Sequence, residues 1–131
     1  MEGEITMLTN RARLVAIAAA VISVGCAQFD PVVSVRTSKS KFDDAAYRGV
    51  TTVVGENTQG LEEFRVFRQA ATGFDQLSHM QDLATSEAIR YCAIRNSRPV
   101  FFRETVSQPP HVLGNWPRAE IVFGCRPLEK P

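Results

Sequence analysis

The chain has 131 residues, of which 15 are basic and 14 acidic, and its formal net charge is +1. A nucleic-acid binder gathers its basic residues on one face. In this chain the basic residues are scattered along the sequence, so we expect no nucleic-acid partner. The length is that of one ordinary domain with a short leader.

The first distinctive feature is the apolar run from Leu14 to Val24, which reads LVAIAAAVISV and follows Arg11 and Arg13. A membrane-spanning helix needs about 20 apolar residues, more than this run offers. A core helix would normally show a polar face at a period of 3.6 residues, and none is present. The run therefore indicates the apolar region of a secretory signal. An uncleaved membrane anchor and a buried helix are the alternatives.

The run ends in Ser23-Val24-Gly25-Cys26, which resembles the lipobox of bacterial lipoproteins: an aliphatic residue, two small residues and a cysteine. Gly25 and Cys26 match this pattern, whereas Ser23 stands where the family usually has leucine. The resemblance covers the first 26 residues. It implies that residues 1–25 are a signal peptide and that Cys26, the first residue of the mature chain, is lipidated on sulfur and acylated, for example with palmitate, on its new amine.

The same resemblance implies a location in the bacterial cell envelope. Ala27, rather than aspartate, follows the cysteine, which implies an outer-membrane lipoprotein that faces the periplasm and is held in the membrane through Cys26. Glu2 and Glu4 are unusual in such a leader. A start at Met7 would remove both, and we expect translation to begin there.

The three cysteines are an odd number for an exported protein. Lipidation of Cys26 would leave Cys92 and Cys125, and an oxidising envelope favours a disulfide between them. Such a bond would close a loop of about 34 residues and stabilise the fold by roughly 4 kcal/mol in the chain-entropy model. Two unpaired core thiols, or a metal site shared with a histidine, are the alternatives.

The first half of the mature chain is expected to contain a tether and two strands. Residues 26–48 begin polar and are interpreted as a tether that includes, in one alternative, a first strand at 32–37. The small α+β domain is then 49–131. Within it, β-branched residues predict a strand at 50–54, and alternation predicts a second strand at 64–68, joined to the first as a hairpin.

A helix is predicted at about 78–95, where Ser78 and Gln81 fit a capping box and Asn96 suits the helix end. Its apolar stripe consists of Met80, Ala84, Ala88, Tyr91 and Cys92.

Two further strands are predicted at 100–106 and about 119–125. Ala119, Ile121, Phe123 and Cys125 share one face of the last strand. The order ββαββ predicts an antiparallel sheet of four to five strands with the helix on one face, which allows Cys92 to meet Cys125.

Candidate catalytic residues are few. The two histidines, His79 and His111, show no metal-site spacing, and no phosphate loop, nucleophile elbow or dinucleotide fingerprint appears. We therefore expect no catalytic residue, cofactor or metal. Glu104 and Glu120 lie on neighbouring predicted strands and are interpreted as two solvated acids on the outer face of the sheet.

The candidate contact surface is the loop 107–118, with His111, Leu113 and Trp116, because long ordered loops with an aromatic residue often bind partners. Trp116 can instead fold back over the sheet as extra core, and this is the interpretation that we favour for the tryptophan. The sequence thus predicts a non-enzymatic envelope lipoprotein, a binding, scaffolding or accessory module with an envelope protein partner. The alternative function is a small periplasmic redox or thiol enzyme that uses Cys92 and Cys125.

Overall fold

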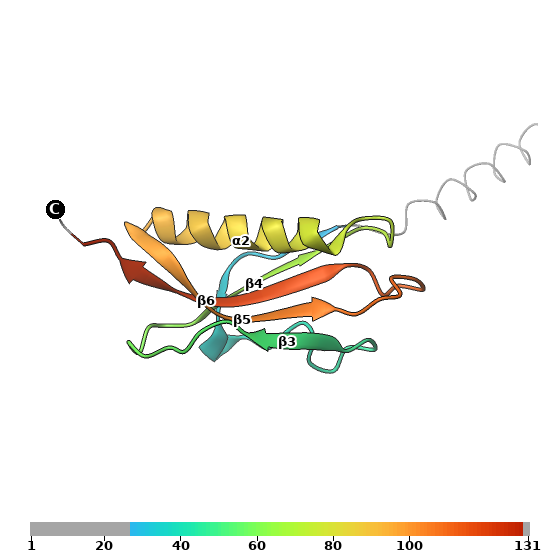
Figure 1. Cartoon of the computed structure of the whole chain (residues 1–131), viewed down its shortest axis with the longest axis horizontal. Helices are drawn as coiled ribbons and strands as arrows, with labels where there is room; N and C mark the ends of the chain where they lie inside the picture. The colour runs from blue at the N-terminus through green and yellow to red at the C-terminus, as the bar shows by residue number, and fades with distance from the viewer. Residues whose placement is uncertain (1–26, 130–131) are drawn as a thin grey trace, which may run out of the picture.

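A computed structural model describes residues 27–129, so the predicted signal peptide (1–25) and Cys26 lie outside the described residues. One α-helix lies across an antiparallel sheet of six strands (Figure 1). The elements in chain order are β1 (Gln28–Phe29), β2 (Val33–Ser34), the 3₁₀ helix η1 (Val35–Thr37), β3 (Gly49–Val53), β4 (Phe64–Gln69), α2 (Leu77–Ala93), β5 (Ser97–Ser107) and β6 (Arg118–Pro127). The α+β class, the helix and the antiparallel sheet are as predicted. The sheet exceeds the expected four to five strands because two short strands, β1 and β2, add to its edge.

The strand order across the sheet is β1-β4-β6-β5-β3, and β2 also pairs with β4. The hairpin predicted between 50–54 and 64–68 is wrong, because β3 pairs with β5 and β4 pairs with β6. A turn does form between them: the Asn57 side chain accepts from the Leu61 N–H at 2.9 Å and donates to its carbonyl at 2.7 Å. The whole connection, residues 54–63, is long enough to carry the chain to the other half of the sheet. The last two strands form the antiparallel pair that the sequence predicts.

The main apolar core lies between α2 and the sheet. Met80, Ala84, Ala88 and Cys92 of the predicted stripe are buried, and Tyr91 is half-buried. Opposite them, the sheet contributes Val66, Ala119, Ile121 and Phe123. The rings of Phe64, Tyr91 and Phe123 pack with centroids 5.0 to 5.9 Å apart, which suits edge-to-face and tilted aromatic contacts. Burial of this apolar surface is the main driving force for folding.

The helix ends differ in how well the sequence predicts them. Asn96 adopts a positive φ of 51° just after the helix, as the predicted stop requires. The capping box is wrong, since the N-cap is Gln76 and makes no side-chain capping bond. Ser78 lies inside the first turn, and the Gln81 amide donates to Glu104 of β5 at 2.8 Å instead of reaching back to the helix start.

Candidate functional site

Cys92 and Cys125 form a disulfide that joins α2 to β6, as the sequence predicts. Cys92 has no exposed surface and packs with Val66, Ala88 and Phe123, and Cys125 contacts the same cluster. A reactive cysteine needs a partly exposed, electropositive site that stabilises its thiolate. Cys92 is fully buried and Cys125 is partly buried against the same apolar cluster, which suits a structural crosslink.

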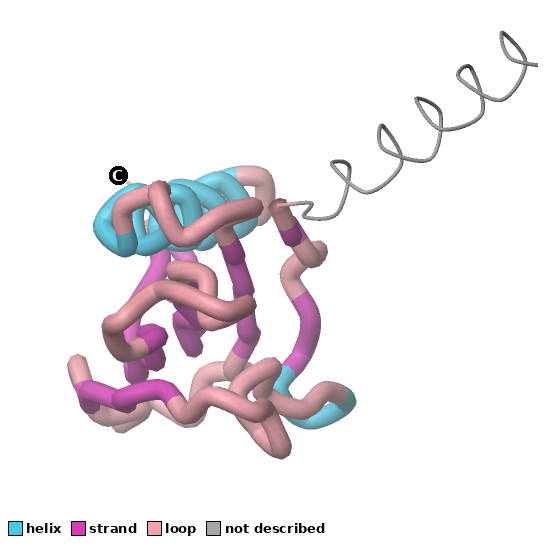
Figure 2. The backbone as a smooth tube through the Cα atoms, turned by 90° about the vertical axis from the view of Figure 1, so that its right-hand side faces the viewer, coloured by secondary structure: helices cyan, strands magenta, loops and turns pink. Residues whose placement is uncertain are grey.

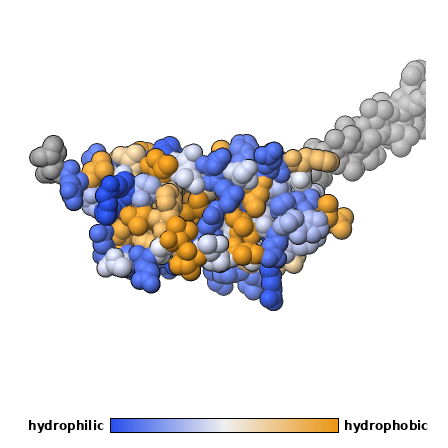
Figure 3. Space-filling view, viewed as in Figure 1, coloured by the Kyte–Doolittle hydropathy of each residue, from blue (hydrophilic) through white to orange (hydrophobic). Residues whose placement is uncertain are grey.

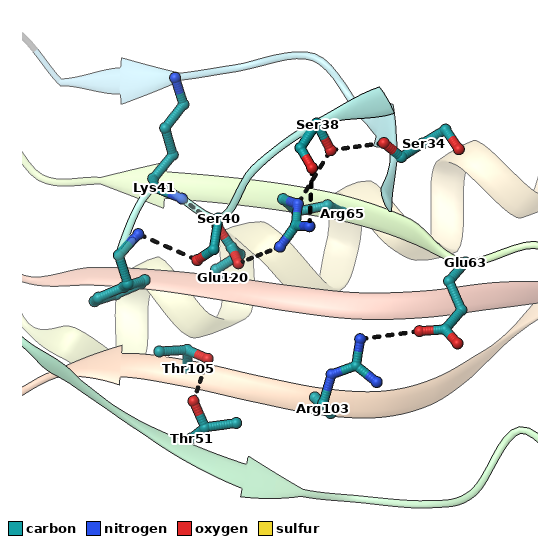
Figure 4. A network of polar contacts seen from close by, with 11 residues as sticks. Ser34, Ser38, Ser40, Lys41, Thr51, Glu63, Arg65, Arg103, Thr105 and Glu120 are labelled. Carbon is teal, nitrogen blue, oxygen red and sulfur yellow. Dashed lines mark hydrogen bonds and ion pairs between the residues drawn. The ribbon is translucent and has the colours of Figure 1, made fainter. Parts of the chain in front are cut away.

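The face of the sheet away from α2, which we call the open face, carries a network of polar side chains (Figure 4). The side chains that the three central strands place on this face include Arg65 and Phe67 of β4, Glu120 and Val122 of β6, and Arg103 and Thr105 of β5. The N-terminal segment, residues 27–48, runs along part of this face. The open face is therefore built from two regions far apart in the sequence.

Glu120 is the centre of this network. It is only 3% exposed. Its Oε1 accepts from Arg65 Nη1 at 2.9 Å, and its Oε2 accepts from the backbone N–H of Lys41 at 3.0 Å. Arg65 Nε also donates to Ser38 Oγ at 3.2 Å. Since both carboxylate oxygens are used, the pair fastens residues 38–41 to β4 and β6.

The interpretation of Glu104 and Glu120 as solvated outer-face acids is wrong. Glu120 is covered by the N-terminal segment, and Glu104 faces α2, where it accepts from Gln81. The register between β5 and β6 shifts between Phe101 and Arg103, so that Glu104 pairs with Ile121 on the helix side. The two carboxylates thus lie on opposite faces and form no acid pair.

An aromatic contact holds the next part of the segment. The Phe42 ring packs edge-on against Phe67 with centroids 6.2 Å apart, and the Arg118 guanidinium lies 4.8 Å from the Phe42 ring centre. Gly49 makes room for this ring, because a Cβ there would lie 2.6 Å from Phe42 Cδ1. The segment interpreted as a tether thus contributes two short strands, hydrogen bonds to the Arg65–Glu120 ion pair and an aromatic contact to the folded domain.

Two open grooves flank the segment. One, of ≈ 410 Å³, lies between residues 30–41 and β4, and the other, of ≈ 430 Å³, lies over Glu120 and Arg103. Lys41 pairs with Asp30 at 3.5 Å, and Arg103 pairs with Glu63 at 2.9 Å. Across residues 27–129, every buried side-chain nitrogen or oxygen has a hydrogen-bond partner. In the same range no His, Cys, Asp and Glu side chains gather as a metal site. Charged side chains line both grooves, and Val33 and Phe67 add apolar surface to the first.

The predicted contact loop is held by side-chain hydrogen bonds at one end of the sheet. The Asn115 side chain donates to the carbonyls of Gln108 and Pro110 at 2.8 and 2.9 Å, and its Oδ1 accepts from Arg118 at 3.0 Å. Arg118 also donates to the carbonyl of Tyr47 at 2.7 Å. Arg118 is itself buried, and burial lowers the pKa of its guanidinium.

The three predicted contact residues have different surroundings. His111 Nε2 lies 3.0 Å from Ser107 Oγ. Trp116 is half-buried beside Gly73, and Leu113 is 87% exposed. Asn115 and Arg118, which organise the loop, were not singled out from the sequence, since nothing local shows that their partners lie across the loop.

No family model matches the sequence, and neither curated proteins nor solved structures show a significant similarity to it. Among the described residues, no helix has the length and hydropathy needed to cross a membrane.

Proposed function

We propose that this protein is a lipid-anchored protein of the bacterial cell envelope, attached through Cys26, exposed to the periplasm at the outer membrane, and non-enzymatic. The observation that carries the proposal is the Cys92–Cys125 disulfide. It uses two of the three cysteines and leaves Cys26, which directly follows the apolar run. Stable disulfides are typical of proteins exported to oxidising compartments. The anchor and the disulfide therefore account for all three cysteines together.

The domain fits a binding, scaffolding or accessory module better than a redox enzyme. Redox-active cysteines exchange with a partner thiol and need access. Cys92 is fully buried in the main core, between α2 and the sheet. The open face instead provides an ordered surface on which an envelope protein partner can bind.

Lipid labelling tests the anchor directly. Cells that express the full chain are grown with a palmitate analogue that carries a clickable tag, and the labelled fraction is measured on a gel. Cys26→Ala should abolish labelling and release or mislocalise the protein. The matched control is Ser23→Leu, which restores the usual lipobox residue and should keep labelling or raise it. Membrane retention of unlabelled Cys26→Ala would favour an uncleaved helix and contradict the anchor.

A thiol count tests the cysteine assignment in the same preparation. If Cys26 is lipidated and the other two are paired, denatured protein should show no alkylatable thiol before reduction and two after it. A chain without lipid would show one thiol before reduction and three after it, as its three cysteines require. Two thiols that react without reductant would overturn the structural disulfide and support a thiol function.

Crosslinking in intact cells, followed by purification of the tagged chain, tests the binding role. The expected result is a discrete crosslinked envelope protein that is lost when the tagged chain carries substitutions on the open face. A chain that forms no crosslinked species would contradict the binding role.

A further inference from the structure

One end of the sheet collects four chain segments. β1 begins there, because Gln28 pairs with Gln69, the last residue of β4, and Gln69 pairs with Arg118, the first residue of β6. The loops 70–76 and 108–117 therefore extend from the same end. Loop 43–48 joins them, since the Tyr47 hydroxyl donates to the Leu113 carbonyl at 2.8 Å. Figure 2 views the molecule from this side, with the loops in front, and we call it the anchor end.

Only a very short stretch of chain connects the anchor end to Cys26. Strand β1 begins at Gln28, two residues after Cys26. Two residues of extended chain span at most about 7 Å. A lipidated Cys26 would therefore hold β1, and with it the neighbouring loops, at the level of the lipid headgroups. The chain lacks the spacer that would let the domain stand away from the membrane.

The tips of these loops are apolar and exposed. Phe74 is 99% exposed, Leu113 87% and Val112 53%. Gly73 brings the two loops together, because its Cα is so close to His111 that a Cβ would lie 2.0 Å from the His111 carbonyl oxygen. Apolar side chains are visible at the right-hand end of the surface in Figure 3. Exposed apolar side chains on an ordered support commonly mark an interaction site.

We propose that the anchor end rests on the lipid bilayer, with Phe74, Val112 and Leu113 inserted among the headgroups and upper acyl chains. The inference depends on the proposed lipidation of Cys26. We assign this end to a bilayer because residues 26–28 are too short to leave room for anything else. A protein partner at this end would have to fit between the domain and its own anchor. Shallow insertion of apolar side chains is how peripheral proteins reinforce a lipid anchor.

Depth-dependent fluorescence quenching tests the proposal on the full lipidated chain. The reporter is Leu113→Trp in a Trp116→Phe background, so that the chain has a single tryptophan at the loop tip. The protein is reconstituted in vesicles of phosphatidylethanolamine and phosphatidylglycerol, with or without brominated acyl chains. The matched control is Leu128→Trp in the same background, because Leu128 is 57% exposed at the opposite end, where its N–H bonds to Asn96.

The reporter at position 113 should show blue-shifted emission, strong quenching by brominated lipid and several-fold weaker quenching by aqueous iodide than the reporter at 128. Phe74→Trp in the same background is a second reporter on the other loop and should behave like position 113. Acylation of Cys26 is measured by mass spectrometry on the same sample. Acylated protein with both loop reporters fully open to iodide would overturn this inference and leave the anchor intact. Protein without acyl chains would overturn the anchor itself, and the inference with it.

Discussion

The two faces of the sheet are stabilised in different ways. On the helix face, apolar residues of α2 and the sheet bury one another, and a disulfide joins α2 to β6. On the open face, the chain buries Arg65 and Glu120 and covers them with the N-terminal segment, whose Lys41 lies 79 residues before Glu120 in the sequence. The helix face depends on burial and a covalent bond, whereas the open face depends on a polar network in which each member needs its partners.

This difference has a consequence for how each face responds to mutation. On an apolar face, a substitution lowers the unfolding free energy in proportion to the apolar volume that it removes. Removal of one charge from a buried ion pair is strongly destabilising, because the other charge stays buried without a partner. The central strand β6 takes part in both faces: Phe123 and Ile121 point to the helix, and Glu120 points to the N-terminal segment. Mutations on β6 and its neighbours can therefore separate the two kinds of stabilisation.

The largest effect is expected on the helix face from loss of the disulfide. Cys92 and Cys125 are separated by 33 residues, so the double variant Cys92→Ala/Cys125→Ala should lose about 4 kcal/mol of unfolding free energy in the chain-entropy model. Urea denaturation followed by circular dichroism measures this loss. Reductant should produce a similar loss in the unmodified protein and none in the variant. A urea midpoint that does not move on reduction would mean that packing alone holds the helix.

The next effect is expected on the open face from Glu120→Met. This change leaves Arg65, whose side chain is only 12% exposed, without its charge partner, and should cost about 3 kcal/mol. It also removes the acceptor of the Lys41 N–H, so amide exchange at Lys41 should accelerate. Urea denaturation and hydrogen exchange measure the two effects.

A second variant and a control make this result specific. In Arg65→Met/Glu120→Met no charge is left buried, and most of the lost stability should return. The control is Glu63→Ala, which breaks the more exposed pair with Arg103 and should cost less than about 1 kcal/mol. A double variant as unstable as Glu120→Met would show that the open face does not depend on charge pairing.

The sequence predicts the helix face well because its signals are local and periodic. The stripe from Met80 to Cys92 and the alternation from Ala119 to Cys125 each follow from the period of one element, and the disulfide follows from putting the two together. The wrong capping box shows the limit of a local rule, since the amide of Gln81 finds a stronger partner in Glu104 across the core.

The open face could not be predicted in the same way, because the contacts that close it join distant segments. Glu120 looks like an outward-facing strand residue until Lys41 and Arg65 are seen around it. The hairpin predicted between 50–54 and 64–68 fails for the same reason: strand pairing is decided by the whole sheet, and β3 pairs with β5 instead. The sequence thus does not show whether a polar side chain on a strand is exposed or buried until its partners are known.

The smallest effect is expected from Glu87, on the side of α2 that lies next to β4. Glu87 of α2 is bonded to Arg90 and lies 3.8 Å from Arg68 of β4. The hydrogen bond from Arg90 holds the pKa of Glu87 below its ordinary value of 4.5. A carboxylate with a lowered folded-state pKa stabilises the protein above its unfolded pKa, and this contribution is lost as the pH falls through the folded value.

Glu87→Gln should therefore cost stability at pH 7 and cost less as the pH falls below 4.5. Arg90→Gln should reproduce most of this change, because the bond from Arg90 is its largest cause. Urea midpoints from pH 7 to pH 3 measure the difference. If the midpoints of Glu87→Gln and the unmodified protein differ by the same amount at every pH, this side of the helix, like its apolar face, is held without charge.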